Sequence, residues 1–308
     1  MSQTIPEPLA TISRMVPGSN GRIHVADHPG EGTPLVLLHG FPDDSRIYDR
    51  LIPPLAHRRV LALDWPGYGR SDRPAQGALD LTNHQSTLRA VLDSLELDQV
   101  ALVAHDASGP DAIDFALTEP GLVAHLILLN TYYGHAPTLR LPEMISLLAD
   151  RDFAPLADAM IGDPNQRLWL LAHTATRFGL TLGEGGVGTV SVAPQFFGGA
   201  DQSDALTAIR AWTGALYPAL DEQDSHIAAG HLAALDVPVT VVFGARDEYL
   251  NPDLGRHLAG LFAGAELRLV DDSSHWPQWD QPEVVARTIE EALSASRSSR
   301  APTPERLS

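Results

Sequence analysis

The stretch VALVAHDASGPDAIDFAL, residues 100–117, contains the turn around which the rest of the chain can be interpreted. Its first five residues form a short apolar run typical of a buried strand, and a helical pattern follows Pro110. Asp106 stands at the corner between them, and the small residues Ala104 and Ser108 lie two positions before and after it. Small residues at these positions leave room for the crowded backbone of a nucleophile elbow, in which one reactive side chain stands on a sharp strand-to-helix turn. The stretch therefore predicts that the carboxylate of Asp106 is exposed to a substrate.

Two other interpretations of this turn are open on its sequence alone. Asp106 can be a helix N-cap, because aspartate is common at that position. Alternatively, Ser108 can be the nucleophile, although this would place Asp106 where a small residue is needed and the serine in the first helical turn.

Short apolar runs alternate with helical patterns on both sides of this turn. Continuous apolar strands between helices indicate a parallel sheet that is covered on both faces. The chain begins with two alternating segments around a hairpin turn, Ser19-Asn20-Gly21. Further strands are predicted at 34–38, 60–63, 100–104, 126–129, 237–243 and 265–270, and helices at 47–56, 82–95, 111–117, 253–262 and 282–295.

The alternation stops near Tyr132 and resumes near residue 233. We expect a core in two parts, 1–132 and 233–295, interrupted by a helical cap at 133–232, with helical patches at 142–148 and 166–177 and a loose stretch at 179–202. An insertion after a strand's carboxyl end would lie over the ligand side of the sheet and act as a lid. The glycine-rich GEGGVG at 183–188 lacks the preceding strand and the following Lys-Ser or Lys-Thr of a phosphate loop, so it predicts a flexible lid loop. The tail, 296–308, is rich in Ser, Arg and Pro and is expected to be disordered.

Other polar residues follow the predicted strands in a specific order. A candidate nucleophile, an acid and a histidine appear as Asp106, Asp247 and His275, each just beyond a strand. This is the chain order of an α/β-hydrolase triad. Further motifs after the strands are His39-Gly40-Phe41-Pro42, the run from Asp64 to Pro74, Gly244-Ala245-Arg246-Asp247 and Ser274-His275-Trp276-Pro277.

With these motifs, the sequence from about residue 10 to 295 resembles the α/β-hydrolase superfamily. The segments HGFP, GYGRSDRP and VAHD are similar to its aspartate-nucleophile branch, which includes epoxide hydrolases, haloalkane dehalogenases and fluoroacetate dehalogenases. The resemblance implies an α/β-hydrolase fold with a mostly parallel central sheet, helices on both faces and a helical lid insertion.

An aspartate nucleophile implies displacement at a saturated carbon, because a carboxylate reacts weakly with ordinary esters. The product is an alkyl ester of Asp106, which water activated by His275 then hydrolyses while Asp247 orients the imidazole. Backbone N–H groups of Phe41 and Ala107 are the expected oxyanion donors. Candidate substrate-binding residues are His39, Tyr132, Tyr133 and Trp276.

Epoxide hydrolases use lid tyrosines to hydrogen-bond the epoxide oxygen, and the segment Ala211–Ala219 resembles the lid segment that carries one of them. Tyr217 is therefore the candidate, and Tyr132 or Tyr133 could supply a second donor. The leading hypothesis is an epoxide hydrolase acting on a small or medium apolar epoxide. The alternatives are a haloalkane or haloacid dehalogenase, disfavoured because Ala107 and Phe41 replace the usual halide donors, and a non-catalytic ligand-binding protein with the same fold.

The composition limits the possible partners of the chain. It has 308 residues, a formal net charge of −18 and no cysteine, so it is a poor candidate for nucleic acid or anionic membranes and has no disulfide or cysteine metal site. No His/Asp/Glu spacing suggests a metal, and we expect no cofactor. The N-terminus lacks a signal-peptide pattern, and no apolar run approaches the ~20 residues of a membrane span. A cytoplasmic monomer or homodimer that binds a small apolar substrate is expected.

Overall fold

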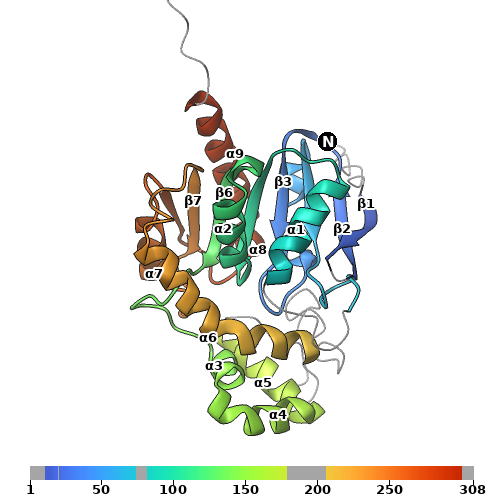
Figure 1. The fold of residues 1–308 in the computed structure, drawn as a ribbon, viewed down its shortest axis with the longest axis vertical. Coiled ribbons are helices and arrows are strands. Elements are labelled where there is room, and N and C mark those ends of the chain that lie inside the picture. Colours follow the sequence, from blue (N-terminus) through green and yellow to red (C-terminus); the bar gives the residue numbers. More distant parts are fainter. Residues whose placement is uncertain (1–10, 20, 74–81, 179–205, 300–308) are drawn as a thin grey trace, which may run out of the picture.

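The computed structural model describes residues 11–19, 21–73, 82–178 and 206–299. Within these ranges, eight strands form a single sheet that runs through the upper part of the molecule in Figure 1. The strands are β1 (Ile12–Gly18), β2 (Gly21–His28), β3 (Glu31–Leu38), β4 (Arg58–Leu63), β5 (Val100–Asp106), β6 (Val123–Thr131), β7 (Val239–Gly244) and β8 (Glu266–Val270).

The strand order places β5 near the middle of the sheet. The order is β1-β2-β4-β3-β5-β6-β7-β8, and β2 is antiparallel to both β1 and β4. All other neighbours are parallel. The carboxyl ends of β3, β5, β6, β7 and β8 therefore meet at one edge, where a parallel sheet binds its ligands. The predicted α/β-hydrolase fold class is confirmed.

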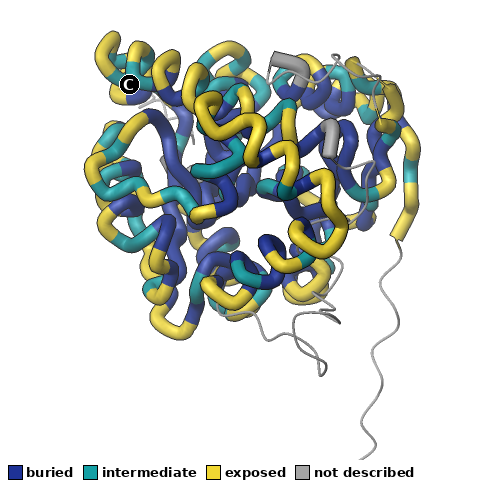
Figure 2. The backbone as a smooth tube through the Cα atoms, turned by 90° about the horizontal axis from the view of Figure 1, so that it is seen from below, coloured by how far each residue is buried: buried dark blue, intermediate teal, exposed yellow. Residues whose placement is uncertain are grey.

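Helices cover both faces of the sheet, which explains why β5, β6 and the second half of β3 are almost fully buried. α1 (Thr82–Ser94), α2 (Ser108–Thr118) and α7 (Pro252–Gly260) pack against strands. α9 (Pro282–Ser299) contacts β6 and the 3₁₀ turn η2 (Pro53–Leu55) on the other face. Figure 2 shows the inward-facing parts of the chain as buried and the outer turns as exposed.

Between β6 and β7 the chain leaves the sheet, and its described residues form four α-helices beyond the carboxyl edge (Figure 1). We call these helices the helical segment: α3 (Glu143–Ala149), α4 (Ala154–Gly162), α5 (Pro164–Arg177) and α6 (Leu206–Ala228). The remaining short turns are η1 (Ser45–Tyr48), η3 (Pro120–Leu122), η4 (Arg151–Phe153) and α8 (Pro277–Asp280). No described helix is long and apolar enough to cross a membrane.

The structure differs from the expected elements in two places. The helix expected at 47–56 is wrong: the chain forms the separate 3₁₀ turns η1 and η2, since Pro53 and Pro54 cannot donate the backbone bonds of a longer helix. α9 continues to Ser299, beyond the expected end at residue 295, so 296–299 do not belong to a disordered tail. The glycine-rich loop at 183–188, the loose stretch at 179–202 and residues 300–308 lie outside the described residues.

Candidate active site

Asp106 ends β5 in a strained backbone conformation. Its φ is +50°, in the left-handed region that aspartate adopts less often than glycine, and α2 begins two residues later. Close packing holds this corner: a Cβ added at Gly40 would lie 2.5 Å from the Cβ of Asp106, and one added at Gly109 would lie 1.9 Å from Thr131 Oγ1. The N-cap of α2 is Ala107, so the interpretation of Asp106 as the cap is wrong. The corner has the form of a nucleophile elbow.

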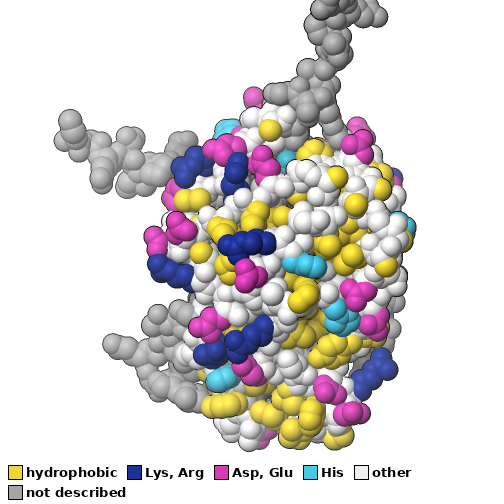
Figure 3. All heavy atoms as spheres, turned by 90° about the vertical axis from the view of Figure 1, so that its left-hand side faces the viewer, with side chains coloured by type: hydrophobic (Ala, Val, Ile, Leu, Met, Phe, Trp, Pro, Cys, Tyr) yellow, Lys and Arg dark blue, Asp and Glu magenta, His cyan; other side chains and the backbone are white. Residues whose placement is uncertain are grey.

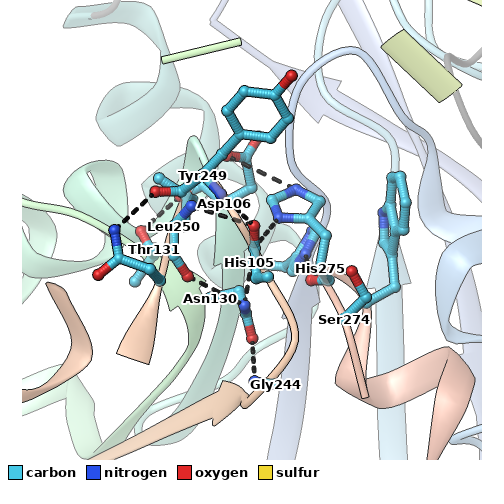
Figure 4. A network of polar contacts seen from close by, with 12 residues as sticks. His105, Asp106, Asn130, Thr131, Gly244, Tyr249, Leu250, Ser274 and His275 are labelled. Carbon is cyan, nitrogen blue, oxygen red and sulfur yellow. Dashed lines mark hydrogen bonds and ion pairs between the residues drawn. The ribbon is translucent and has the colours of Figure 1, made fainter. Parts of the chain in front are cut away.

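The carboxylate of Asp106 has two unequal oxygens. The backbone N–H of Phe41 donates to Oδ2 at 3.0 Å, and the N–H of Ala107 also hydrogen-bonds the carboxylate. The other oxygen, Oδ1, lies 4.0 Å from Nε2 of His275. The backbone N–H of Phe41 therefore holds Oδ2, whereas Oδ1 faces the imidazole of His275 (Figure 4).

His275 follows β8 and is paired with the acid that follows β7. Its Nδ1 donates to Oδ2 of Asp247 at 2.8 Å, and both side chains are buried. This bond leaves Nε2 directed toward Asp106. Asp106, Asp247 and His275 thus come together from three strands, as the chain order predicted, in the geometry of a catalytic triad.

Asn130 at the end of β6 holds the acid in place and was not a predicted site residue. Its Nδ2 donates to Asp247 Oδ2 at 2.9 Å, and its Oδ1 accepts the N–H of Gly244 at 2.8 Å (Figure 4). The backbone N–H groups of Tyr249 and Leu250 donate to the other oxygen of Asp247. Asp247 therefore accepts four hydrogen bonds, which fix the position of its carboxyl group.

His105 supports the histidine from the opposite side. This buried residue lies between the apolar strand and Asp106, and its Nε2 donates to the backbone carbonyl of His275 at 2.8 Å. Burial and the nearby ring of His275 lower the pKa of His105 well below its usual value. His105 is consequently a neutral support for the loop that carries the base.

The charges of the triad influence one another. Burial by itself lowers the pKa of His275, but the charge and hydrogen bond of Asp247 and the charge of Asp106 outweigh it, so the pKa is raised above its usual value. Burial raises the pKa of Asp106, while His275 and the backbone donors of Phe41 and Ala107 oppose this effect. The pair thus consists of a buried carboxyl group beside an imidazole whose pKa is raised above its usual value.

Replacing Asn130 with alanine is expected to lower kcat by about tenfold and to leave KM nearly unchanged. The variant removes one of four hydrogen bonds to Asp247, which holds the imidazole without touching substrate. The pH dependence of kcat should also shift, because a less firmly held carboxylate changes the pKa of His275. Steady-state pH profiles of the variant and of Gln99→Ala, an exposed amide away from the site, provide the comparison. An unchanged pH profile would contradict this role.

A small, mostly apolar cavity of about 30 Å³ opens directly above the carboxylate. Asp106 and His275 contribute its polar part. Its wall includes Phe41, Tyr132, Met144, Phe178, Trp212 and Trp276. The indole of Trp212 stacks on Phe41 with ring centroids 4.1 Å apart, so α6 closes the cavity over the oxyanion loop. The mostly apolar lining of the cavity suits an apolar group rather than a charged one.

Comparison with known families agrees with this geometry. The family described as alpha/beta hydrolase fold matches residues 33–282. The chain belongs to this family. The chain is 34% identical over 128 residues to haloalkane dehalogenase 2 of Mycobacterium tuberculosis, a match that covers 41% of this chain and 44% of the relative. The chain thus spans less than half the length of this curated relative.

Other curated relatives match this chain over nearly the whole of their own length. It is 26% identical to 2-hydroxy-6-oxononadienedioate/2-hydroxy-6-oxononatrienedioate hydrolase of Klebsiella pneumoniae, over 89% of this chain and 93% of the relative. Among solved structures, a haloalkane dehalogenase from Agrobacterium tumefaciens has a TM-score of 0.73 and 22% identity, with 93% of this chain and 97% of that chain covered. At this identity the structural likeness shows the fold alone.

The structure brings only some of the expected substrate-binding residues to this cavity. Tyr132 and Trp276 line it. His39 does not: its Nε2 accepts the N–H of Trp65 at 3.0 Å and its Nδ1 donates to the carbonyl of Gly40, so it shapes the oxyanion loop instead. Tyr133 faces away as well, because its hydroxyl lies within hydrogen-bonding distance of Asp114 and of His226.

Tyr217, the expected lid tyrosine, is also not at the site. This residue is 38% exposed on α6. It lines neither this cavity nor the larger one that lies between α2 and α6. The helix period explains this, because Trp212, Leu216 and Ala219 form the face of α6 that turns toward the core, and Tyr217 lies about 100° from Leu216 around the helix axis. The resemblance of the segment did not define its helical phase.

Ser108 is excluded as the nucleophile by its contacts. It is buried, its hydroxyl donates to the carbonyl of His39, and it accepts the indole N–H of Trp65 at 2.7 Å. Ser108 thus fixes the oxyanion loop against α2. Among the residues that the structure describes, no group of His, Asp and Glu side chains is arranged to hold a metal ion.

Proposed function

We propose that this hydrolase opens small apolar epoxides through an ester of Asp106. The observation that carries this proposal is the hydrogen bond from the N–H of Phe41 to Oδ2 of the carboxylate. With a serine nucleophile, an oxyanion hole receives the carbonyl oxygen of the substrate. Here the backbone donors already hold an oxygen of the enzyme's own side chain. This arrangement suits a reaction in which the carbonyl that water attacks belongs to Asp106.

In the first step, Oδ1 of Asp106 forms a bond to one epoxide carbon and the carbon–oxygen bond of the ring breaks. The electron pair of that bond goes to the epoxide oxygen, which needs a proton or a hydrogen-bond donor. In the second step, His275 takes a proton from water and the resulting hydroxide attacks Cγ of Asp106. The oxyanion forms on Oδ2, where Phe41 donates, and collapses as the Cγ–Oδ1 bond breaks. His275 returns its proton to the departing oxygen, and the second proton of the water replaces the one that the epoxide oxygen took up, so the diol leaves and the carboxylate is regenerated.

Tyr132 is the side chain best placed to donate to the epoxide oxygen. It lines the cavity with Asp106, is only 4% exposed, and its hydroxyl has no hydrogen-bond partner among the described residues. Burial and the charges of Asp106 and Asp111 raise its pKa well above the usual value, so it stays protonated. The other tyrosine of the cavity, Tyr249, already donates to Glu143 at 2.6 Å. A buried hydroxyl without an acceptor favours a substrate oxygen as its partner.

Replacing Tyr132 with phenylalanine is expected to lower kcat/KM for styrene oxide by about 10²-fold, since one donor to a developing oxyanion is worth about 3 kcal/mol. The exposed Tyr217→Phe serves as the matched control and should retain wild-type kinetics. Rates of diol formation measure both variants. Equal rates for Tyr132→Phe and wild type would contradict the role of this hydroxyl.

Haloalkane dehalogenation is the second candidate, and two observations favour it. One is the similarity to haloalkane dehalogenase 2 over 128 residues. The other is the indole of Trp212, which lines the cavity and has no hydrogen-bond partner in the described parts of the chain. The same ester chemistry would then expel a halide. Release of bromide from short bromoalkanes, with no diol from epoxides, would decide for this candidate and would remove Tyr132 as the essential donor.

A further inference from the structure

A second and larger cavity lies beside the catalytic one, between α2 and α6. It has a volume of about 700 Å³ and is open to solvent; we call it the side groove. Tyr132 and Trp212 belong to the walls of both cavities, and Ala107, the residue after the nucleophile, also lines the groove. A molecule that reacts at Asp106 could therefore extend past these two aromatic side chains into the groove.

The polar residues of the side groove carry negative charge. Asp111 and Asp114 come from α2 and Glu222 from α6, and none of the described residues that line the groove is lysine or arginine. Two histidines, His226 and His231, also line the groove. The groove therefore repels an anion and attracts a cation, independently of the chemistry at Asp106.

Two buried polar groups in the groove have free bonding capacity. Asp111 is 8% exposed, and its Oδ2 accepts from Nδ1 of His84 at 2.8 Å, while its Oδ1 has no hydrogen-bond partner in the described part of the chain. The hydroxyl of Tyr132 also lacks a partner there, and the charge of Asp111 acts on it. Neither oxygen is among the fully buried atoms that lack a partner, so both can reach solvent and can bond a ligand that enters from the groove.

The carboxylates of the groove also disfavour one another. Burial raises the pKa of Asp114 to about 6, and the charges of Asp111 and Glu222 add to this increase, although a hydrogen bond from Tyr133 and the charge of His226 oppose it. A positive group in the groove would relieve this repulsion.

The rest of the groove is apolar and includes an aromatic face. Leu117 from α2 and Leu216 and Ala219 from α6 line it together with the ring of Trp212. An indole face attracts quaternary and protonated amines, particularly where water is partly excluded. The groove thus combines carboxylates with an aromatic wall, the two features that recognise an organic ammonium group.

We propose that the side groove is a subsite for an ammonium group of the substrate, so that this hydrolase prefers amphiphilic amines whose apolar part carries the reactive carbon. The substrate class rests on the proposed function, whereas the preference for a cation rests on the groove alone. The apolar part fills the cavity above Asp106, and the ammonium group passes Tyr132 to lie between Asp111 and Glu222.

Binding of unreactive probes tests the groove without any turnover. Calorimetric titration would use phenylpropyl trimethylammonium, its neutral isostere with carbon in place of nitrogen, and phenylbutyrate as the anion. The ammonium probe is expected to bind at least about tenfold more tightly than the neutral one, and the anion most weakly. Replacing Glu222 with glutamine or Asp111 with asparagine should reduce this preference about threefold each.

Asp221→Asn provides the matched control. Asp221 precedes Glu222 on α6, is highly exposed and does not line the groove, so its removal changes the net charge equally without changing the subsite. Equal binding of the ammonium and neutral probes, or an equal loss in Asp221→Asn and Glu222→Gln, would overturn the proposal. A preference for the ammonium probe in a protein that converts neither epoxides nor haloalkanes would support the subsite and refute the proposed function.

Discussion

Replacing Asp106 with asparagine is expected to lower epoxide turnover by about 10⁶-fold, the size of effect seen when a nucleophile is removed from a catalytic unit. The amide is a much weaker nucleophile than the carboxylate whose Oδ1 is left free beside His275. Intact mass spectrometry of wild type during turnover should also detect the protein plus one whole epoxide, and the variant should show no such adduct. Diol formation by the variant at near wild-type rates would remove Asp106 from the mechanism.

Two companion experiments make this result specific. Asp93→Asn changes an exposed carboxylate on α1 that pairs only with Arg89, and it should retain full activity. A single turnover of wild type in oxygen-18 water should place the heavy oxygen in Asp106 and leave the first diol unlabelled. Heavy oxygen in the first diol, with none in the protein, would instead indicate direct attack by water on the epoxide.

Replacing His275 with glutamine is expected to stop the reaction at the ester of Asp106. Alkylation of Asp106 does not require the histidine to accept a proton, but hydrolysis of the ester does. The variant should therefore accumulate one adduct per protein, while steady-state turnover falls by about 10⁴-fold. With an epoxide the mass gain equals the whole molecule. With a bromoalkane it equals the alkyl group, together with one equivalent of released bromide.

The pH dependence of ester hydrolysis, compared between wild type and His275→Gln, tests whether His275 is the base. Neutral imidazole activates water, so wild-type ester hydrolysis should accelerate as pH rises through the pKa of His275, which Asp247 and Asp106 raise above its ordinary value. The variant should lose this rise. A variant that turns over normally, or whose ester hydrolyses with the wild-type pH profile, would assign the base to another residue.

The sequence predicted the core of the fold well because its strands are continuous apolar runs. Strands such as β5 and β6 are buried on both faces, so no alternation obscures their pattern. The helical segment was harder to predict. α6 contains Gly214 and Pro218 in its interior, both of which normally argue against a helix, and contacts with α3 stabilise it nonetheless. A local sequence pattern does not show such tertiary contacts.

The candidate site shows the same division. Asp106, Asp247 and His275 stand at the ends of strands that lie close together in the sheet. Their order along the chain was therefore enough to predict that they meet. Asn130 lies at the end of such a strand as well, but nothing in the sequence links its amide to Asp247. The hydrogen bond between the two side chains is visible only in the structure. Tyr217 failed for the opposite reason, because a linear resemblance does not specify which face of a long helix turns inward.

In the proposed mechanism, the hold of the backbone on Oδ2 makes the two oxygens of Asp106 inequivalent from one cycle to the next. The diol would leave with the atom that was Oδ1, and an atom from water would take its place, while Oδ2 stays on the N–H of Phe41 throughout. As long as the side chain does not rotate, the enzyme therefore exchanges the same oxygen atom in every cycle and never the other. In oxygen-18 water a working enzyme would keep one light oxygen at this position indefinitely.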